Sequence, residues 1–429
     1  MTNEYAGWLL TGPVCLSRWD LIKNLSAHGI KPIGVSDQQV ESGLLIDRGI
    51  KLLYMPHIVC VSRKAADHVR QFVESGGTVI ADYGVGAFDE WGKPLERGFL
   101  DEVFGVSRSE LKKMSGNAVP VLSETTPAFS PPLGEYPCSS DSEFPINYRE
   151  GDLRVTTGKA LGTVSKQNHA QGFILNRCGR GNALLFNFFS QGFSLPDDKS
   201  GGVVQERWFQ FAGAILKLAG VAPQVQVTAG NKPLKFFDVN RFKRGGAWYV
   251  GVLRYPDEVA DSIISTGGGA HAPRTPGRTA EPEAVSISMP ARGHMYELRS
   301  HRYLGQHNIV NDSFKVGDLN DAVKVYAVLP YPVQGVRLAA PRQGKRSAVL
   351  DYSVAVVGAD GSADHAIRIE VVNPQGRFPE AYQKKVVALK GKFQGRLPLA
   401  LNDLPGAWVI KATDIISGKS TTAQVQVTK

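Results

Sequence analysis

Short apolar runs alternate with amphipathic stretches over the first half of the chain. Residues 31–36 (KPIGVS), 50–56 (IKLLYMP) and 78–83 (TVIADY) are predicted to be short buried strands. Residues 62–77 (SRKAADHVRQFVESGG) lie between the last two and are predicted to form a helix, capped by Ser62 and ended by two glycines. Apolar strands that alternate with helices are typical of a parallel sheet covered on both faces.

The pattern changes twice further along the chain. Residues 121–148 are rich in Pro and Ser, which indicates a long irregular loop. Residues 158–189 are predicted to be strands around a Gly-rich turn, and residues 201–223 form an amphipathic helix that ends at a proline. After residue 223 the apolar period becomes two, which predicts β-strands as far as the C-terminus. Residues 341–429, with short strands and Gly, Asn and Asp turns, are typical of a small β-sandwich.

Composition narrows the function classes. The chain has 429 residues and a formal charge of +9, with Lys and Arg spread along it, so nucleic-acid binding is not expected. None of the four cysteines lies in a CxxC pair, so we expect neither a metal nor a cofactor. The first residues lack a signal-peptide profile and no apolar run approaches about 20 residues, which predicts a soluble chain without membrane contact and leaves its compartment unknown.

Cys60 and His57 are the candidate catalytic residues. A strand, a cysteine and a helix follow one another here (LLYMPHIVCVSRKAADHV), which is how some α/β enzymes present a nucleophile. The segment around Cys60 has no glycine for a strained turn, however, and cysteine is commonly a buried structural residue. His57 lies where parallel strands deliver ligand-contacting residues, although a hydrogen-bonded loop histidine is the simpler interpretation.

Further candidates lie in the segment DYGVGAFDEWGKP, residues 82–94. Tyr83 and Asp89 are candidate binding residues there. Asp82, Asp89 and Glu90 lie around two glycines, and paired carboxylates can serve sugar or metal chemistry. A turn built from Asp and Gly is the competing interpretation. The aromatic residues Trp248, Tyr249, Tyr255 and Tyr296 could stack on sugars, but their strand positions favour core packing. The sequence contains no complete active site.

The order of these parts resembles a known family. Residues 50–106, from IKLLYMP to LDEVFGV, resemble the middle domain of glycoside hydrolase family 42 β-galactosidases, called the trimerisation domain. The shared features are the strand that ends in MP, the helix AADHVRQFVESGGTVI and the segment FDEWGKP. The later stretch GFILNRCGRGNALLFNF resembles the return of the same domain. The resemblance covers residues 1–222 and implies a flavodoxin-like, class I glutamine amidotransferase-like α/β fold.

The resemblance continues into the second half and has two departures. Residues 223–340 are similar to β-domains that follow such modules, and residues 341–429 look like an immunoglobulin-like sandwich with Trp408 as a core anchor. The family's catalytic barrel has no counterpart in this chain. The amidotransferase Cys-His-Glu triad is also unmatched, so the resemblance assigns no catalytic residue.

We therefore expect three domains: an α/β domain (1–222), a β-domain (223–340) and an Ig-like sandwich (341–429). The resemblance implies a non-catalytic accessory and oligomerisation portion of a glycoside-hydrolase-like protein in carbohydrate metabolism. Its expected partners are other copies of the first domain, or a catalytic barrel domain, and carbohydrate. The alternatives are a stand-alone cysteine-dependent hydrolase or amidotransferase-like enzyme, and a carbohydrate- or protein-binding module.

Overall fold

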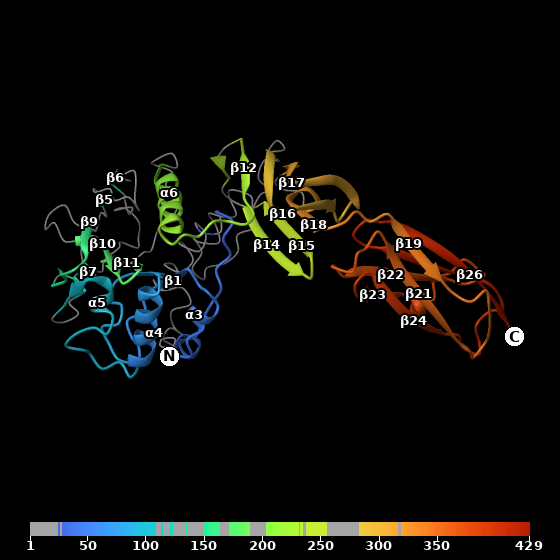
Figure 1. The fold of residues 1–429 in the computed structure, drawn as a ribbon, viewed down its shortest axis with the longest axis horizontal. Helices are drawn as coiled ribbons and strands as arrows, with labels where there is room; N and C mark the ends of the chain where they lie inside the picture. Colours follow the sequence, from blue (N-terminus) through green and yellow to red (C-terminus); the bar gives the residue numbers. More distant parts are fainter. Residues whose placement is uncertain are drawn as a thin grey trace, which may run out of the picture. The chain divides into compact units, whose positions relative to one another are not determined.

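A computed structural model describes most of the chain (Figure 1). The described residues are 25, 28–108, 113–114, 121–122, 134–135, 149–150, 152–163, 171–188, 203–230, 232–234, 237–254, 283–315 and 319–429. The chain divides into two compact units, one of residues 1–223 with 256–277 and the other of residues 224–255 with 278–429. The predicted domain boundaries after residues 222 and 340 remain predictions. The described part consists mostly of β-sheet, with few helices.

The first unit contains one seven-stranded sheet in the order β1-β2-β11-β10-β9-β5-β6. β1 pairs with β2, and β2 with β11, in parallel, whereas the remaining pairs are antiparallel. The elements are α2 (Asp37–Glu41), α3 (Leu44–Asp47), β1 (Leu52–Met55), α4 (Arg63–Glu74), β2 (Thr78–Ala81), α5 (Asp101–Phe104), β3 (Val106–Ser107), β4 (Lys113–Met114), β5 (Val121–Leu122), β6 (Gly134–Glu135), β7 (Arg149–Glu150), β8 (Arg154–Val155), β9 (Lys159–Thr163), β10 (Gln171–Cys178), β11 (Gly181–Phe186) and α6 (Val203–Leu218).

Helix α4 and strand β2 form as their sequences predict. The Ser62 hydroxyl accepts the Ala65 N–H and caps α4, whose Val69 and Val73 side chains are buried. β2 is buried on both faces: Val79 belongs to the core beneath α4, and Ile80 to a separate core with α6. The sheet is thus covered on both sides, and this explains why apolar residues follow one another without alternation in β2.

Two predictions for this unit need correction. Residues 31–36 form no strand, because they are mostly exposed and lack the apolar cover that a buried strand requires. The sheet is mixed rather than wholly parallel, because β10 and β11 form a hairpin around Gly179, which has a φ of +58°. A Cβ at Gly181 would lie 2.1 Å from the carbonyl oxygens of Val73 and Gly77. The Gly-rich turn therefore serves close packing against the end of α4.

The second unit is built from three sheets. One has the order β13-β12-β16-β18-β15-β14 with β17 paired to β16, and the others have the orders β19-β21-β24 and β20-β26-β25-β22-β23. The strands are β12 (Val227–Ala229), β13 (Lys232–Pro233), β14 (Phe237–Arg244), β15 (Ala247–Arg254), β16 (Glu283–Glu297), β17 (Arg302–Phe314), β18 (Val323–Leu329), β19 (Gly335–Ala339), β20 (Gln343–Lys345), β21 (Val349–Val357), β22 (His365–Val372), β23 (Lys384–Ala388), β24 (Lys392–Pro398), β25 (Gly406–Asp414) and β26 (Ser420–Thr428); helix α8 (Leu319–Ala322) and the 3-10 helix η2 (Glu380–Tyr382) lie between strands.

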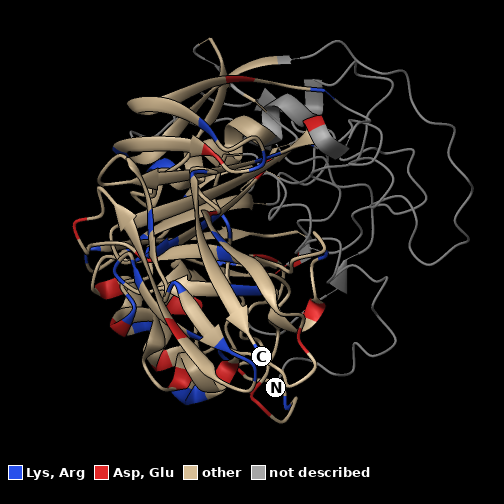
Figure 2. Ribbon diagram, turned by 90° about the vertical axis from the view of Figure 1, so that its right-hand side faces the viewer, with Lys and Arg blue, Asp and Glu red and all other residues tan. Residues whose placement is uncertain are grey.

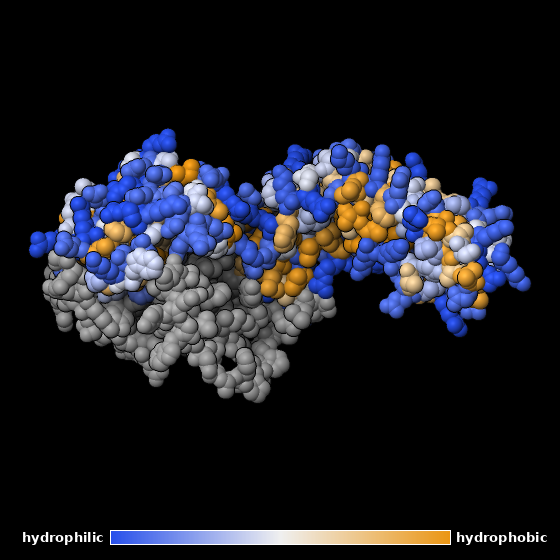
Figure 3. Space-filling model, turned by 90° about the horizontal axis from the view of Figure 1, so that it is seen from below, coloured by the Kyte–Doolittle hydropathy of each residue, from blue (hydrophilic) through white to orange (hydrophobic). Residues whose placement is uncertain are grey.

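Two apolar cores stabilise this unit. Val250 and Val252 of β15 face a core formed within the β12–β18 sheet. Strands β19–β26 form two sheets that share the apolar residues of a second core, and we call this pair of sheets the sandwich. Ala247, at the start of β15, belongs to the same core, which contains Trp408 at 1% exposure. Some apolar side chains remain visible on the surface of this unit (Figure 3). Because one core spans both groups of strands, the β12–β18 sheet and the sandwich share their buried surface.

Candidate functional site

Buried polar side chains gather beyond the carboxyl ends of β1 and β2. His57 follows β1 closely, and Asp82 and Tyr83 directly follow β2. The His57 backbone N–H donates to the Asp82 carboxylate, and the His57 and Tyr83 rings stack with their centroids 6.3 Å apart. This edge of parallel strands is where α/β folds commonly present ligands. We call the following residues the carboxyl-edge cluster: His57, Asp82, Tyr83, Asp101, Arg108 and Glu150.

The centre of the cluster is a buried ion group. The Arg108 Nε lies 2.8 Å from Glu150 Oε2, and its Nη1 lies 3.4 Å from Asp101 Oδ1. All three side chains are almost fully buried, so each charge depends on the others for compensation. Glu150 Oε1 also accepts the Gly84 N–H, and Arg108 Nη1 donates to the Val85 carbonyl. The ion group therefore fixes the loop that follows β2.

Burial controls the protonation of this cluster. It lowers the pKa of His57 to about 4, because the imidazolium form loses its hydration. The imidazole of His57 is therefore neutral at pH 7. Burial raises the pKa of Asp101 and of Glu150, and the Arg108 guanidinium opposes that rise in both. These groups hold the loop and its neighbours in place.

Cys60 lies near this edge but outside the ion group. It forms an isolated bridge with Phe88, two residues before the Ser62 cap of α4. Its thiol is half-buried, and its pKa is raised by burial and by the charge of Asp89. A raised pKa disfavours the thiolate that a nucleophile needs. The catalytic role of Cys60 with His57 stays a prediction.

Asp89 builds a turn that presents an exposed tryptophan. Its Oδ1 accepts the backbone N–H groups of Trp91 and Lys93 at 2.9 and 2.8 Å, which fits the turn interpretation of this segment. Gly92 completes the turn with a φ of +80°. Trp91 is 80% exposed, more than any other large apolar residue described. The sequence signal for it was a tryptophan inside a run of turn-forming polar residues.

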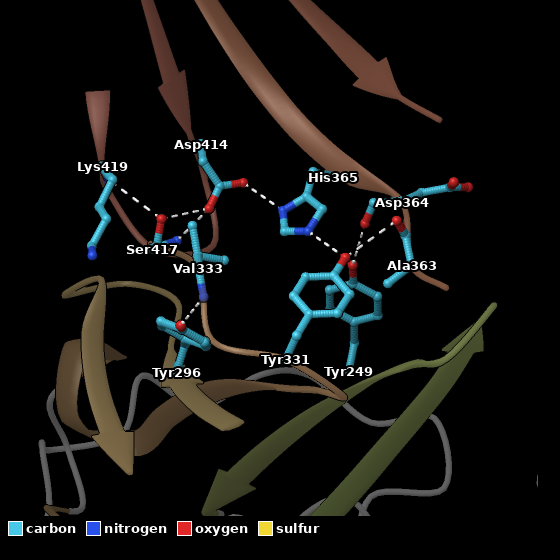
Figure 4. Close-up of polar contacts among 10 residues, drawn as sticks. All are labelled: Tyr249, Tyr296, Tyr331, Val333, Ala363, Asp364, His365, Asp414, Ser417 and Lys419. Carbon is cyan, nitrogen blue, oxygen red and sulfur yellow. Dashed lines mark hydrogen bonds and ion pairs between the residues drawn. The ribbon is translucent and has the colours of Figure 1, made fainter. Parts of the chain in front are cut away.

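A second polar cluster lies in the second unit, between the β12–β18 sheet and the sandwich (Figure 4). His365 is its centre: Nδ1 lies 2.8 Å from Asp414 Oδ1, and Nε2 lies 2.9 Å from the Tyr331 hydroxyl. The Ser417 hydroxyl donates to Asp414 Oδ2 at 2.6 Å. We call Tyr331, His365, Asp414 and Ser417 the relay. Sequence patterns did not indicate it, because its members come from separate strands and loops.

The relay contains a serine, a histidine and an aspartate, but not in a catalytic order. Ser417 bonds to Asp414 rather than to the imidazole, and a tyrosine occupies the position that a nucleophile would need. Burial raises the pKa of Tyr331, so its hydroxyl remains protonated. His365 is 1% exposed and Asp414 is fully buried, which leaves no access for a substrate. The arrangement is suited to holding two groups of strands together.

The aromatic candidates of the second unit take part in packing near this junction. The Tyr296 hydroxyl accepts the Val333 N–H, and the Tyr249 hydroxyl lies 3.5 Å from the Asp364 carbonyl (Figure 4). Trp248 packs against the core of the β12–β18 sheet. Core and junction packing accounts for these three side chains, and the fourth candidate, Tyr255, lies outside the described residues.

In the described part of the chain, no group of three His, Cys, Asp or Glu side chains is placed to hold a metal ion. No helix in the same residues is long and apolar enough to cross a bilayer. Lys and Arg are interspersed with Asp and Glu over the described ribbon (Figure 2).

Comparisons with known proteins identify the fold. No family model matches the sequence, and no curated protein matches it. The β-galactosidase from Bacillus circulans sp. alkalophilus matches with a TM-score of 0.50 and 14% identity, over 74% of this chain and 38% of that chain. Gan42B, a GH42 β-galactosidase from G. stearothermophilus, matches with a TM-score of 0.48 and 14% identity, over 73% of this chain and 36% of that chain. The β-galactosidase from Rahnella sp. R3 matches with a TM-score of 0.47 and 16% identity, over 72% of this chain and 36% of that chain.

The first of these matches shows the class of fold. The chain has a fold related to that of the β-galactosidase from Bacillus circulans sp. alkalophilus, and it spans little more than a third of the length of that structure. At such low sequence identity, the shared property is the fold.

Proposed function

We propose that this chain is the non-catalytic accessory and assembly portion of a glycoside-hydrolase-like protein that acts in carbohydrate metabolism. The similarity to part of a β-galactosidase, over 74% of this chain but 38% of the other, is the observation that carries the proposal. The first domain is the trimerisation-like, flavodoxin-like module, without the catalytic barrel. The parallel strands β1, β2 and β11, with α4 between β1 and β2, support this assignment. The sandwich strands of residues 341–429 form the Ig-like module.

The chemistry of the candidate site also supports a non-catalytic role. The charged groups of the carboxyl-edge cluster compensate one another inside the protein, and His57 is held neutral. The thiol of Cys60 has a raised pKa. Groups in these states serve structure better than acid–base or nucleophilic catalysis. We infer that the first domain contributes a scaffold to an assembly whose catalytic groups belong to a separate barrel domain.

The test combines light scattering with a hydrolysis assay on the full chain. We expect self-association at micromolar concentration and no release of nitrophenol from nitrophenyl β-galactoside. A chain that stays monomeric at every concentration contradicts the assembly role. Turnover by the chain alone contradicts the non-catalytic role. A variant with Cys60→Ser separates a cysteine-dependent hydrolase from contamination, because only the former loses its activity with this change.

The exposed Trp91 favours a second candidate function, carbohydrate binding at the 89–93 turn. A tryptophan that a rigid turn holds in solvent offers an apolar face to a sugar ring, with the side chains of Glu90 and Lys93 beside it in the sequence. Calorimetric titration with galacto-oligosaccharides is expected to give a signal that Trp91→Ala abolishes and Phe378→Ala preserves. Phe378 is a suitable control because it is 59% exposed in the other unit. The absence of binding, or equal binding by both variants, rejects this function.

A further inference from the structure

The five-stranded sheet of the sandwich, in the order β20-β26-β25-β22-β23, has one face that points away from the core. Along β22, Ile367 and Ile369 are buried in the core, and Arg368 between them is exposed. The same alternation holds in the other four strands, because successive side chains of a strand point to opposite faces. We call the outward-pointing residues the outer face: the even-numbered residues of β22 and β26 and the odd-numbered residues of β20, β23 and β25.

Basic side chains dominate the charge of the outer face. It carries Lys345, Arg368, Lys385 and Lys411, and its only acidic residue is Glu370. Glu370 lies 3.5 Å from the Lys411 ammonium and compensates that one charge. In the part of the chain that the structure describes, the other three cations have no ion-pair partner. The outer face therefore has a surplus of uncompensated positive charge.

Two of these cations lie directly opposite each other. Arg368 of β22 is in register with Lys385 of β23. Side chains so placed have Cβ atoms about 5 Å apart, and like charges at this separation destabilise a sheet. The other sheet of the sandwich has the opposite arrangement, because Arg396 of β24 lies opposite Asp351 of β21. An anion from outside the protein would relieve the repulsion on the outer face.

Protection of the sheet edges explains only part of this pattern. Lysines on edge strands hinder pairing with other chains, and this accounts for Lys345 in β20 and Lys385 in β23. Arg368 and Lys411 lie in β22 and β25, which are paired on both sides, so they protect no edge. An exposed arginine beside a lysine is suited to holding a carboxylate or sulfate group, because a guanidinium donates two parallel N–H bonds to such an anion.

The uncharged residues of the outer face indicate which kind of anion fits. Thr422, Gln424 and Gln426 of β26 are exposed, and their hydroxyl and amide groups can bond to sugar hydroxyls. No residue of the outer face is aromatic, whereas proteins that bind single-stranded nucleic acid stack its bases on aromatic side chains. The outer face also lacks the Trp, Phe and Leu residues with which basic surfaces enter a membrane interface.

We propose that the outer face binds an acidic polysaccharide. Its carboxylate or sulfate groups pair with Arg368 and Lys385, and its hydroxyls bond to the polar side chains of β26. Because neighbouring strands are about 4.8 Å apart, β20 and β23 lie about 19 Å apart, so a chain of several sugar units also reaches Lys345. The choice of a polysaccharide among polyanions rests on the proposed function. The proposal adds to that function a class of ligand for the second unit.

The test is calorimetric titration of the full chain with polygalacturonate, dextran sulfate and neutral dextran. We expect binding to at least one of the two acidic polymers, and the tighter of them identifies the preferred anionic group. Neutral dextran should not bind. The affinity should fall about tenfold between 50 and 200 mM salt, because each contact releases counterions. Arg368→Gln combined with Lys385→Gln is expected to lower the affinity about tenfold or more. Arg368→Gln alone, with a loss of about threefold or more, replaces the double variant if that fails to fold.

Lys392→Gln combined with Arg396→Gln is the matched control. Both residues are exposed on β24, in the other sheet, so this change removes the same charge from a different surface. Its affinity should stay within about twofold of the wild type, because salt screens distant charges. An equal loss in the two double variants overturns the site, since only net charge would then matter. Failure to bind either acidic polymer overturns it as well.

Two further probes separate a polysaccharide from other polyanions. Single-stranded DNA and vesicles that contain phosphatidylserine should bind about tenfold more weakly than the acidic polymer at equal charge concentration. Equal or tighter binding of either probe overturns the assignment to a polysaccharide. A failure of these binding tests leaves the proposed function standing. Sugar turnover by the chain, or a strictly monomeric chain, would contradict the proposed function and leave binding at the outer face unaffected.

Discussion

The two buried polar clusters differ in what they hold together. The carboxyl-edge cluster joins loops that follow neighbouring strands of one sheet, through an arginine between two acids. The relay joins two neighbouring strands of one sheet, β22 and β25, to the loop that follows β18, through hydrogen bonds that centre on one histidine and one aspartate. The first cluster depends on charge compensation, and the second on hydrogen-bond geometry. Their responses to mutation and to pH should therefore differ, and each difference can be measured.

The largest effect is expected at Arg108. Arg108→Met leaves two buried acids without their cation, and we expect a loss of about 3–5 kcal/mol in the free energy of unfolding. Urea denaturation at pH 7 measures it. Arg97→Met is the control, because Arg97 is 64% exposed at its side chain and pairs with Glu102 at the surface. That pair should contribute less than about 1 kcal/mol. Equal losses in both variants would contradict the role assigned to the buried ion group.

The second largest effect is expected in the pH dependence of the free energy of unfolding. The pKa of His57 is about 4 in the folded protein and about 6.5 in the unfolded chain, so the unfolded chain binds a proton that the native state excludes. The contribution of the neutral His57 imidazole to the free energy of unfolding is fully present above pH 6.5. It is lost as the pH falls towards 4, for a total of about 3 kcal/mol. His57→Gln should lack this loss in urea denaturation between pH 7 and pH 4.5.

The variant comparison is essential, because two acids of the same cluster act in the opposite direction. The raised pKa values of Asp101 and Glu150 mean that their contribution increases as the pH falls through the raised values. The pH dependence of the wild-type protein alone gives only the sum of the contributions of His57, Asp101 and Glu150. If His57→Gln and the wild type show the same pH dependence, His57 is not the titrating group.

A smaller effect is expected in the relay. Tyr331→Phe removes the hydroxyl that contacts His365 Nε2 and should cost about 1 kcal/mol, the usual net contribution of one hydrogen bond. Tyr303→Phe removes a hydroxyl that forms a solvent-exposed hydrogen bond with His294 and should cost less than about 0.5 kcal/mol. Thermal unfolding of both variants makes the comparison. A larger loss at Tyr303 would show that burial does not set the strength of these bonds.

The smallest expected difference concerns the two described cysteines. Cys60 and Cys178 are both half-buried free thiols with a pKa raised by burial. Iodoacetamide at pH 7 should therefore label both slowly and at similar rates, within about threefold, as followed by peptide mapping. Labelling of Cys60 that is far faster than that of Cys178 would revive the nucleophile hypothesis.

The sequence predicted those elements whose signals are local. Helix α4 has a cap, an apolar face and terminal glycines within one short segment, and it forms where they predict. The apolar period of two after residue 223 predicts β-strands, and the described residues there are mostly strands. Residues 31–36 are apolar enough to resemble a strand, but what decides their conformation is the absence of a covering layer. Local patterns do not contain that information.

The polar clusters were not predictable for the same reason. Glu150 lies 42 residues after Arg108, across a segment without regular patterns, and nothing nearby marks the two as partners. His365 and Asp414 belong to neighbouring strands β22 and β25, whose pairing depends on the whole sandwich. The sequence did place His57 after a strand, but its neutral imidazole follows from burial that only the fold creates.

The core shared by the β12–β18 sheet and the sandwich has a consequence for how the second unit melts. Ala247, Tyr296 and Ala327 belong to the same apolar core as Trp408 and Ile410. Modules that share a core lose their packing at the same time, so calorimetry should record one cooperative transition for the two groups of strands. A chain cut after residue 340 would lose 18 of the 24 buried residues of that core and expose the rest. In thermodynamic terms, residues 224–255 and 278–429 are expected to melt as a single calorimetric unit.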